Sequence, residues 1–154
     1  TTSVAQNGLV KENGNTYYYN NNAKVTNEWE QVNNNWYYFG NEGNAQTGWY
    51  QSQAGFWYYF NNETAQAETG WQKINNVWYY FKDGKAVTGR QNIDGKEYYF
   101  DHLGRQVKGS PISTPKGVEY YESVLGERVT NTWITFQDGK TVFFDENGYA
   151  DFDK

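Results

Sequence analysis

The chain has 154 residues, a length that suits one modest domain or a short repeat array. Only 27 of these are Leu, Ile, Val or Phe, but 20% are aromatic, and disordered chains are poor in aromatic residues, so disorder is excluded. The net charge of −5 with scattered Lys and Arg excludes a basic nucleic-acid groove, no apolar run is long enough to span a membrane, and zero Cys excludes disulfides and thiolate metal sites.

Aromatic clusters recur along the whole chain. The clear copies are Tyr17-Tyr18-Tyr19, Tyr37-Tyr38-Phe39, Tyr58-Tyr59-Phe60, Tyr79-Tyr80-Phe81 and Tyr98-Tyr99-Phe100, followed by the weaker Tyr120-Tyr121 and Val142-Phe143-Phe144. Their first positions are 20, 21, 21, 19, 22 and 22 residues apart. A period near 20 over seven copies indicates a stacked repeat array. The chain opens on Thr1-Thr2-Ser3, without an initiator Met or a signal peptide, and we interpret it as a piece of a longer protein.

Each repeat has the pattern of a short β-hairpin. In the fourth copy a strand over 71–74 is followed by Asn75-Asn76 and a second strand over 77–81. Asn-rich and Asp-Gly pairs supply the positive φ that two-residue hairpin turns require, so the Asn surplus is explained by turns. Because a lone hairpin is marginal in water, the hairpins must stack, and the predicted fold class is an all-β solenoid of stacked short hairpins. Strand alternation places Tyr79 and Phe81 on one face and Trp78 and Tyr80 on the other.

The last part of the chain departs from this pattern. Both prolines, Pro111 and Pro115, fall in residues 110–117, which predicts a loop or an altered connection. We therefore expect five hairpin repeats over residues 1–109, a connection over 110–117, and two degenerate repeats over 118–154.

The residues needed for catalysis or metal binding are missing from the sequence. His102 is the sole histidine and falls in a predicted turn. Five aspartates also fall at turn positions, where Asp is favoured for backbone reasons: Asp83, Asp94, Asp101, Asp138 and Asp145. Residues 145–148 have only part of the spacing of a calcium loop. We expect no catalytic residues, no metal and no cofactor.

Partly exposed aromatic faces surrounded by Gln, Asn, Thr and Lys suit a carbohydrate. Sugars place C–H groups on the ring face and hydroxyls against amide and ammonium groups. Repetition of weak sites gains avidity for a polymer, which a binding protein needs and an enzyme does not.

The fifth repeat, residues 91–109, resembles the glucan-binding repeat of bacterial glucansucrases such as dextransucrases, and residues 69–81 fit the broader cell-wall-binding superfamily. The likeness is good over residues 7–109 and loose over 118–150. It implies a non-catalytic domain that binds α-1,6-linked glucan such as dextran or isomalto-oligosaccharides. It also implies secretion to the extracellular space or bacterial surface, and a sucrose-dependent catalytic domain in the same parent chain.

The resemblance also implies pockets between successive hairpins, each with an aromatic platform and nearby Gln and Lys. Tyr98 with Gln106 and Lys108 matches that pattern directly, and Tyr58 with Gln66 keeps the same eight-residue spacing. The remaining residues that it assigns to carbohydrate binding are Tyr79, Gln72, Lys73 and Gln91. An exposed strand position without ligand is an equal alternative for each polar residue. Arg128 stands at the Gln position of the sixth repeat, where we expect little binding.

Three alternatives stay open. A choline-binding module, which would anchor a protein to cell-wall teichoic acids, cages a quaternary ammonium between rings, and the Trp29/Trp36, Trp49/Trp57 and Trp71/Trp78 pairs resemble that arrangement. The repeats also resemble the receptor-binding region of clostridial toxins, which would bind cell-surface oligosaccharides. A structural spacer with all rings buried is the third alternative.

Overall fold

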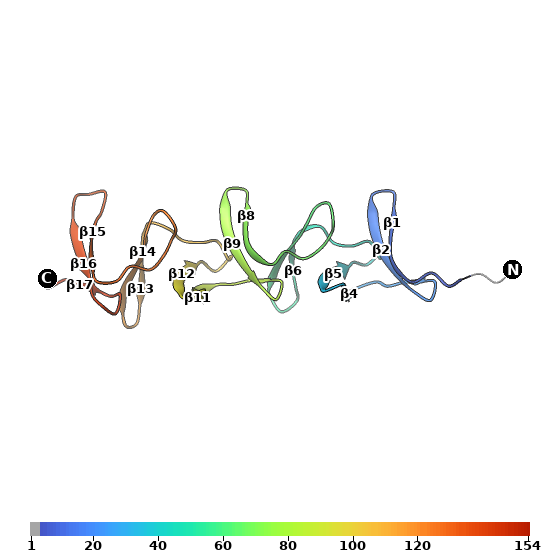
Figure 1. Ribbon diagram of the computed structural model, residues 1–154, viewed down its shortest axis with the longest axis horizontal. Helices are drawn as coiled ribbons and strands as arrows, with labels where there is room; N and C mark the ends of the chain where they lie inside the picture. Colours follow the sequence, from blue (N-terminus) through green and yellow to red (C-terminus); the bar gives the residue numbers. More distant parts are fainter. Residues whose placement is uncertain (1–3) are drawn as a thin grey trace. The chain divides into compact units, whose positions relative to one another are not determined.

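The computed structural model describes residues 4–154, and that part of the chain contains strands and turns but no helix (Figure 1). Its strands form seven antiparallel sheets, one for each predicted repeat. The all-β prediction of short hairpins, about seven in number, is therefore confirmed. Residues 1–3 of the first predicted segment lie outside the described range.

The seven hairpins follow one another along the sequence. The first three are β1 (Gly8–Glu12) with β2 (Asn15–Asn20), β4 (Glu28–Val32) with β5 (Asn35–Phe39), and β6 (Gly48–Gln51) with β7 (Trp57–Phe60). The others are β8 (Gly70–Ile74) with β9 (Val77–Lys82), β11 (Gly89–Ile93) with β12 (Lys96–Phe100), β13 (Ser110–Thr114) with β14 (Gly117–Tyr121), and β15 (Thr132–Thr135) with β16 (Thr141–Phe144). Two-residue strands extend the first, fourth and seventh sheets: β3 (Ala23–Lys24), β10 (Lys85–Ala86) and β17 (Ala150–Asp151).

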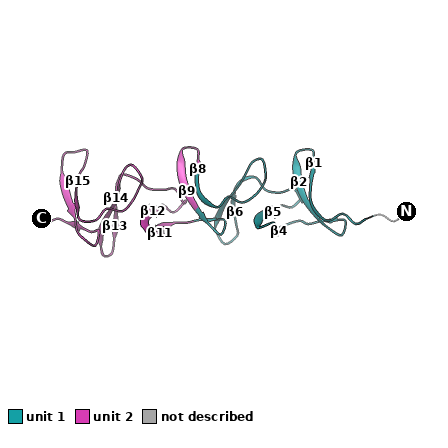
Figure 2. Ribbon diagram, viewed as in Figure 1, with its two compact units in different colours: residues 1–72, 81–86 teal, residues 73–80, 87–154 magenta. Residues whose placement is uncertain are grey.

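The hairpins form two compact units (Figure 2). The first comprises residues 1–72 with 81–86, and the second comprises residues 73–80 with 87–154. Each unit is described by itself below.

The hairpin turns have the backbone that their sequences predict. Asn33 and Asn34 have φ of 50° and 68°, and Asn75 and Asn76 have φ of 51° and 65°. In the fifth hairpin Asp94 has a φ of 53°. Consecutive left-handed residues give the primed turn whose twist matches that of the flanking strands. The interpretation of the Asn surplus as turn chemistry is confirmed.

The core is a repeated aromatic position rather than one aliphatic cluster. The last ring of each aromatic triplet is buried: Tyr19, Phe39, Phe60, Phe81 and Phe100, with Tyr121 and Phe144 in the degenerate repeats. Tyr79 lies two residues before Phe81 and is 9% exposed, whereas Trp78 and Tyr80 are half-buried. The predicted sorting of rings between the two strand faces is thus confirmed.

Within each unit a recurring backbone hydrogen bond links successive hairpins. The chain segment that returns after a hairpin forms an isolated backbone β-bridge with the residue whose ring is buried, as in Phe60↔Ala67. The N–H of Ala67 then donates to the carbonyl of Trp36 in the preceding hairpin at 2.8 Å. The same bond joins other pairs: Ala45 to Thr16, Gln106 to Trp78, and Arg128 to Glu97, at 2.7 to 2.9 Å. These bonds identify equivalent positions from one repeat to the next.

The segment expected to be a connection, residues 110–117, contains a regular strand. Ser110–Thr114 pairs with Gly117–Tyr121 over its whole length, and Pro111 lies opposite Tyr120. A strand with one neighbour needs only half of its N–H groups, so a proline can sit where the N–H would point away from the ladder. The expectation of a loop here is wrong for residues 110–114, while the predicted division into domains stays a prediction.

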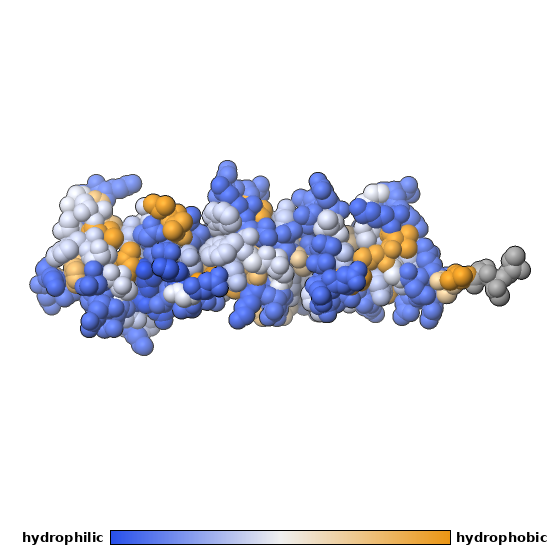
Figure 3. Space-filling view, in the orientation of Figure 1, coloured by the Kyte–Doolittle hydropathy of each residue, from blue (hydrophilic) through white to orange (hydrophobic). Residues whose placement is uncertain are grey.

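The surface is largely polar. The face in Figure 3 is mostly hydrophilic, with small separate apolar patches. Exposed apolar side chains are scattered along the chain rather than confined to one repeat: Val4, Phe56, Leu103, Val124, Leu125 and Phe152. Within residues 4–154, no helix could cross a membrane.

Candidate functional site: an aromatic pocket

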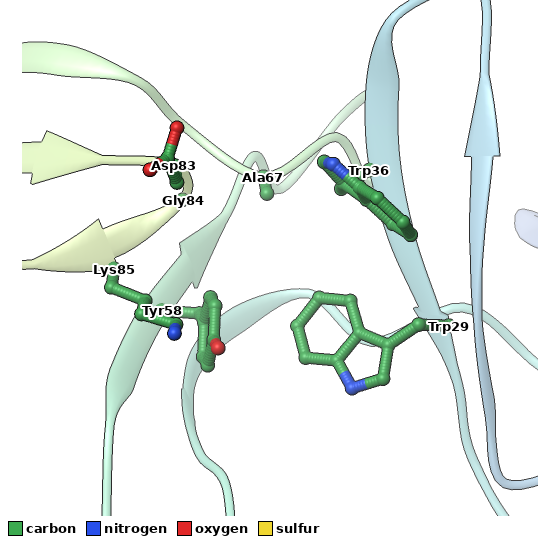
Figure 4. Close-up of a pocket in the computed structure, with 7 residues that line it drawn as sticks. All are labelled: Trp29, Trp36, Tyr58, Ala67, Asp83, Gly84 and Lys85. Atoms are coloured by element: carbon green, nitrogen blue, oxygen red, sulfur yellow. The ribbon is translucent and has the colours of Figure 1, made fainter.

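A pocket of about 350 Å³ lies in the first unit, walled by rings from two hairpins (Figure 4). Trp29 of β4 and Trp36 of β5 meet edge to face, with ring centroids 6.4 Å apart and planes at 76°. Tyr58 of β7 faces them from the next hairpin, with its ring centroid 4.7 Å from that of Trp29. Three rings therefore converge on one cavity.

The hairpin ladders hold these rings in place. Trp29 pairs with Tyr38, and Trp36 pairs with Gln31, so both tryptophans project from one hairpin whose register is fixed. Tyr58 is 9% exposed, and burial raises the pKa of its hydroxyl, which favours the neutral form. Trp36 is 41% exposed and forms the open side of the pocket. The pocket thus combines fixed inner rings with one accessible ring.

The rim of the pocket carries polar groups from the turn between β9 and β10, which follows the fourth hairpin. Asp83, Gly84 and Lys85 line it, together with Ala67. The Lys85 ammonium lies over the Phe56 ring, 4.3 Å from its centroid, which holds the cation at the rim. Gly84 packs closely against Tyr58: a Cβ at this position would be 3.5 Å from the Tyr58 ring. A ligand in this pocket would meet aromatic faces, with the charged residues Asp83 and Lys85 at the edge of the cavity.

Of the residues predicted from sequence, Tyr58 lines this pocket and Gln66 does not. The Gln66 amide donates to the hydroxyl of Tyr37 at 3.1 Å. The predicted equivalence of Gln66 and Gln106 is wrong, because Ala67 bridges Phe60 where Gln106 bridges Phe100. The third repeat has one extra residue in its turn, with Ala65 at a φ of 62°, so equal spacing from the tyrosine gives the wrong register.

Two other predicted glutamines make matching local bonds. Gln72 donates to the carbonyl of Thr69 at 3.0 Å, and Gln91 donates to that of Thr88 at 2.7 Å. Each amide therefore caps the chain segment that leads into its strand. Lys73 is exposed on β8. Their role in ligand binding stays a prediction.

The predicted group around Tyr98 is held by the next turn of the second unit. Gln106 donates to the carbonyl of Leu125 at 2.9 Å, and Lys108 donates to that of Val124 at 3.1 Å. Burial, with the negative charge of Glu127 and other nearby acids, raises the pKa of the half-buried Tyr98. These three residues share one region of the second unit, and their polar groups support the fold there.

Tyr79, the last predicted platform, is buried. Burial raises the pKa of its hydroxyl, and the nearby charges of Arg105 and Asp101 act in opposite directions on it. As with the other predicted residues, contact with a ligand stays a prediction.

Of the remaining pocket residues, only Trp29 and Trp36 stand out in the sequence, as a pair that resembles a choline cage. Ala67, Asp83 and Lys85 belong to no binding motif. Asp83 was interpreted as a turn residue, which it is, with a φ of 53°. Predicting these residues would require the register between hairpins. Asp83 follows Ala67 by 16 residues, and the two line the same cavity only because the hairpins stack. Within residues 4–154, no cluster of His, Cys, Asp or Glu could hold a metal ion.

Two repeat families match this chain. The choline-binding repeat matches residues 87–133, and the cell wall binding repeat matches residues 7–22, 27–45 and 69–84. Choline binding protein F from Streptococcus pneumoniae is similar in structure, with a TM-score of 0.77, 28% identity, and coverage of 95% of this chain and 52% of that one. CbpJ from S. pneumoniae TIGR4 has a TM-score of 0.77 and 27% identity, covering 95% of this chain and 48% of that protein.

Sequence similarity extends to larger streptococcal enzymes. Glucosyltransferase-I of Streptococcus downei is 43% identical over 70 residues, which are 45% of this chain and 4% of that protein. Glucosyltransferase-S of Streptococcus mutans is 44% identical over 68 residues, 44% of this chain and 5% of that protein. The chain thus spans a small part of these relatives. The chain therefore contains choline-binding and cell wall binding repeats, and part of it is homologous to a small region of the streptococcal glucosyltransferases.

Proposed function

We propose that this chain is a non-catalytic carbohydrate-binding domain that binds α-glucan with α-1,6 linkages. The observation that carries the proposal is the three-ring pocket with Asp83 and Lys85 on its rim. A glucose ring presents C–H groups to Trp and Tyr faces, and its hydroxyls donate to a carboxylate and accept from an ammonium. Rings alone suit many ligands, but rings together with hydrogen-bonding groups of both kinds suit a sugar.

Binding strength in this proposal comes from repetition. One shallow pocket should bind an oligosaccharide with a Kd around millimolar, which is about −4 kcal/mol. A polymer that engages several pockets gains avidity without any new contact. The edge-to-face arrangement of Trp29 and Trp36 recurs in the next hairpin, where Trp49 and Trp57 have centroids 6.1 Å apart and planes at 86°. The recurrence supports more than one site on the chain.

The identity of 43–44% to glucosyltransferases supports a place for this domain beside the catalytic domain of a sucrose-dependent glucansucrase. In that setting the domain would hold the finished or growing glucan, outside the cell or at its surface. The partners expected are therefore the polysaccharide and the catalytic domain of the same parent chain.

A second candidate ligand is a quaternary ammonium such as choline. The specific observation in its favour is the closeness of the rings, with Tyr58 4.7 Å from Trp29 in a pocket whose walls are mainly aromatic. Rings attract an ammonium cation through their faces. Lys85 on the rim opposes this ligand, since it adds a positive charge next to the cage, and a quaternary ammonium has no use for its hydrogen bonds.

Migration in native gels with and without dextran, with choline chloride as a separate competitor, tests the proposal. We expect dextran to retard the protein and choline to leave that retardation unchanged. Unretarded migration would refute glucan binding. In that case quenching of Trp fluorescence by choline would establish the second candidate, and no quenching would favour the spacer.

A further inference from the structure

The second unit contains a counterpart of the aromatic pocket that is made of charged residues. Arg90 pairs with Tyr99 as Trp29 pairs with Tyr38. The carbonyl of Glu97 accepts the inter-hairpin hydrogen bond that the carbonyl of Trp36 accepts in the first unit. Glu119 precedes the buried Tyr121 by two residues, just as Tyr58 precedes Phe60. Arg128 forms a backbone β-bridge with Tyr121, just as Ala67 does with Phe60. The positions of the three rings and of Ala67 are thus occupied by two arginines and two glutamates.

These four residues form one network of ion pairs. The Glu119 carboxylate forms ion pairs with the guanidinium groups of Arg90, at 2.8 Å, and Arg128, at 3.4 Å. Glu97 receives the same two arginines, each at 3.4 Å. The hydroxyl of Tyr121 also donates to Glu119 at 2.7 Å. The charges balance, two against two, so the network needs no charge from a ligand to neutralise it.

The network fills the space that is open in the first unit. The side chains of Glu119 and Arg128 are 2% and 7% exposed. The Arg128 guanidinium lies over the Tyr149 ring at 4.8 Å and donates to the carbonyl of Asn147 at 2.9 Å. A Cβ at Gly148 would be 2.8 Å from three atoms of that guanidinium. The turn that contributes Asp83, Gly84 and Lys85 to the open pocket has Asn147, Gly148 and Tyr149 as its counterparts, and here it is packed against arginine.

We propose that this position is a closed pocket, in which Arg90, Glu97, Glu119 and Arg128 exclude the ligand that the aromatic pocket binds. A neutral sugar or a quaternary ammonium would have to break the buried ion pair of Glu119 and Arg128 in order to enter, and neither offers charges that replace both partners. The identity of the residues at these four positions therefore decides, hairpin by hairpin, whether a site is open. The choice of ligand rests on the proposed function, but the closure itself does not.

The first test uses the unaltered protein. Isomaltotriose, and choline separately, are titrated while side-chain N–H signals are followed by NMR. We expect the indole signals of Trp29 and Trp36 to shift with the saturating ligand. The Arg128 Nε–H has no hydrogen-bond partner among the described residues, so its NMR signal would shift if a ligand entered this site. We expect this signal not to shift with either ligand. A saturable shift of this signal with the same midpoint would overturn the proposal.

The second test exchanges the two sets of residues. Arg90→Trp, Glu97→Trp, Glu119→Tyr and Arg128→Ala together should create one additional binding equivalent, measured by calorimetry. The reverse exchange, Trp29→Arg, Trp36→Glu, Tyr58→Glu and Ala67→Arg, should remove one equivalent. A folded first variant with no added equivalent overturns the proposal. If that variant does not fold, the NMR result on the unaltered protein decides.

Failure of the proposed function is distinguishable from failure of this inference. If isomaltotriose shifts no tryptophan signal but choline does, the proposal of glucan binding is wrong. The closed pocket is then tested by following the Arg128 Nε–H signal during the choline titration. If neither ligand binds, thermal unfolding decides. Replacing Glu119 by Gln removes the negative charge that Arg90 and Arg128 share. The midpoint of thermal unfolding should therefore fall by roughly 10 °C. An unchanged midpoint would show that the charges do not hold the site closed.

Discussion

Replacing Trp36 with Ala should weaken sugar binding at the aromatic pocket about ninefold. The side chain is 41% exposed, and a Trp presents up to ~250 Å² of surface, so about 100 Å² is accessible to a ligand. A sugar ring that covers half of that area buries about 50 Å², which at ~25 cal/mol per Å² is about 1.3 kcal/mol. Since about 1.4 kcal/mol corresponds to a tenfold change in Kd, this loss raises the Kd nearly tenfold.

The assay is an NMR titration with isomaltotriose, read on the indole N–H of Trp29, which reports this pocket alone. A short oligosaccharide avoids avidity, and a signal from folded protein separates affinity from stability. Trp133→Ala is the matched control, because Trp133 is also a half-exposed ring on a hairpin strand, in the second unit, and it should leave the Trp29 titration unchanged. A change below twofold for Trp36→Ala in the folded protein would refute the assignment of the pocket.

Three further predictions follow from particular contacts. Gln66→Ala removes the hydrogen bond to Tyr37 and should lower stability by about 1 kcal/mol in denaturant unfolding, yet leave the Trp29 titration within twofold of the unaltered protein. Gly148→Ala should destabilise the second unit by more than 1 kcal/mol, since its φ is +83° and its Cβ would press on Arg128; an unchanged unfolding midpoint would contradict this. Burial raises the pKa of Tyr50 to about 12, so its contribution to stability should be complete below pH 10 and be lost as the pH rises to 12; ultraviolet absorbance at alkaline pH checks the pKa.

Much of the fold could be predicted from the sequence because each hairpin is specified locally. Paired asparagines at positive φ and aromatic triplets of fixed alternation are short-range signals, and they repeat. Residues 110–114 were predicted poorly for the same reason. Proline is a local signal against a strand, but it is tolerated when the strand has a free edge, and the sequence alone does not show which edge is free.

The candidate site was harder to predict because it depends on register between repeats. Counting from Tyr58 selected Gln66, whereas the extra turn residue puts Ala67 at the equivalent of Gln106. Several of the predicted polar groups already have partners within the fold. Backbone carbonyls accept from the amides of Gln72, Gln91 and Gln106 and from the ammonium of Lys108, and the Tyr37 hydroxyl accepts from Gln66. The approach of Lys85 to the pocket depends on stacking, and no spacing within one repeat reveals it.

The backbone hydrogen bond that links neighbouring hairpins has an evolutionary consequence. It uses only an N–H and a carbonyl, so it persists whether the residue that donates is Ala67, Gln106 or Arg128. Side chains at the junction are thus free to drift while the spacing between hairpins is inherited unchanged. The side chains at one junction can therefore be replaced without altering the backbone link that joins the hairpins there.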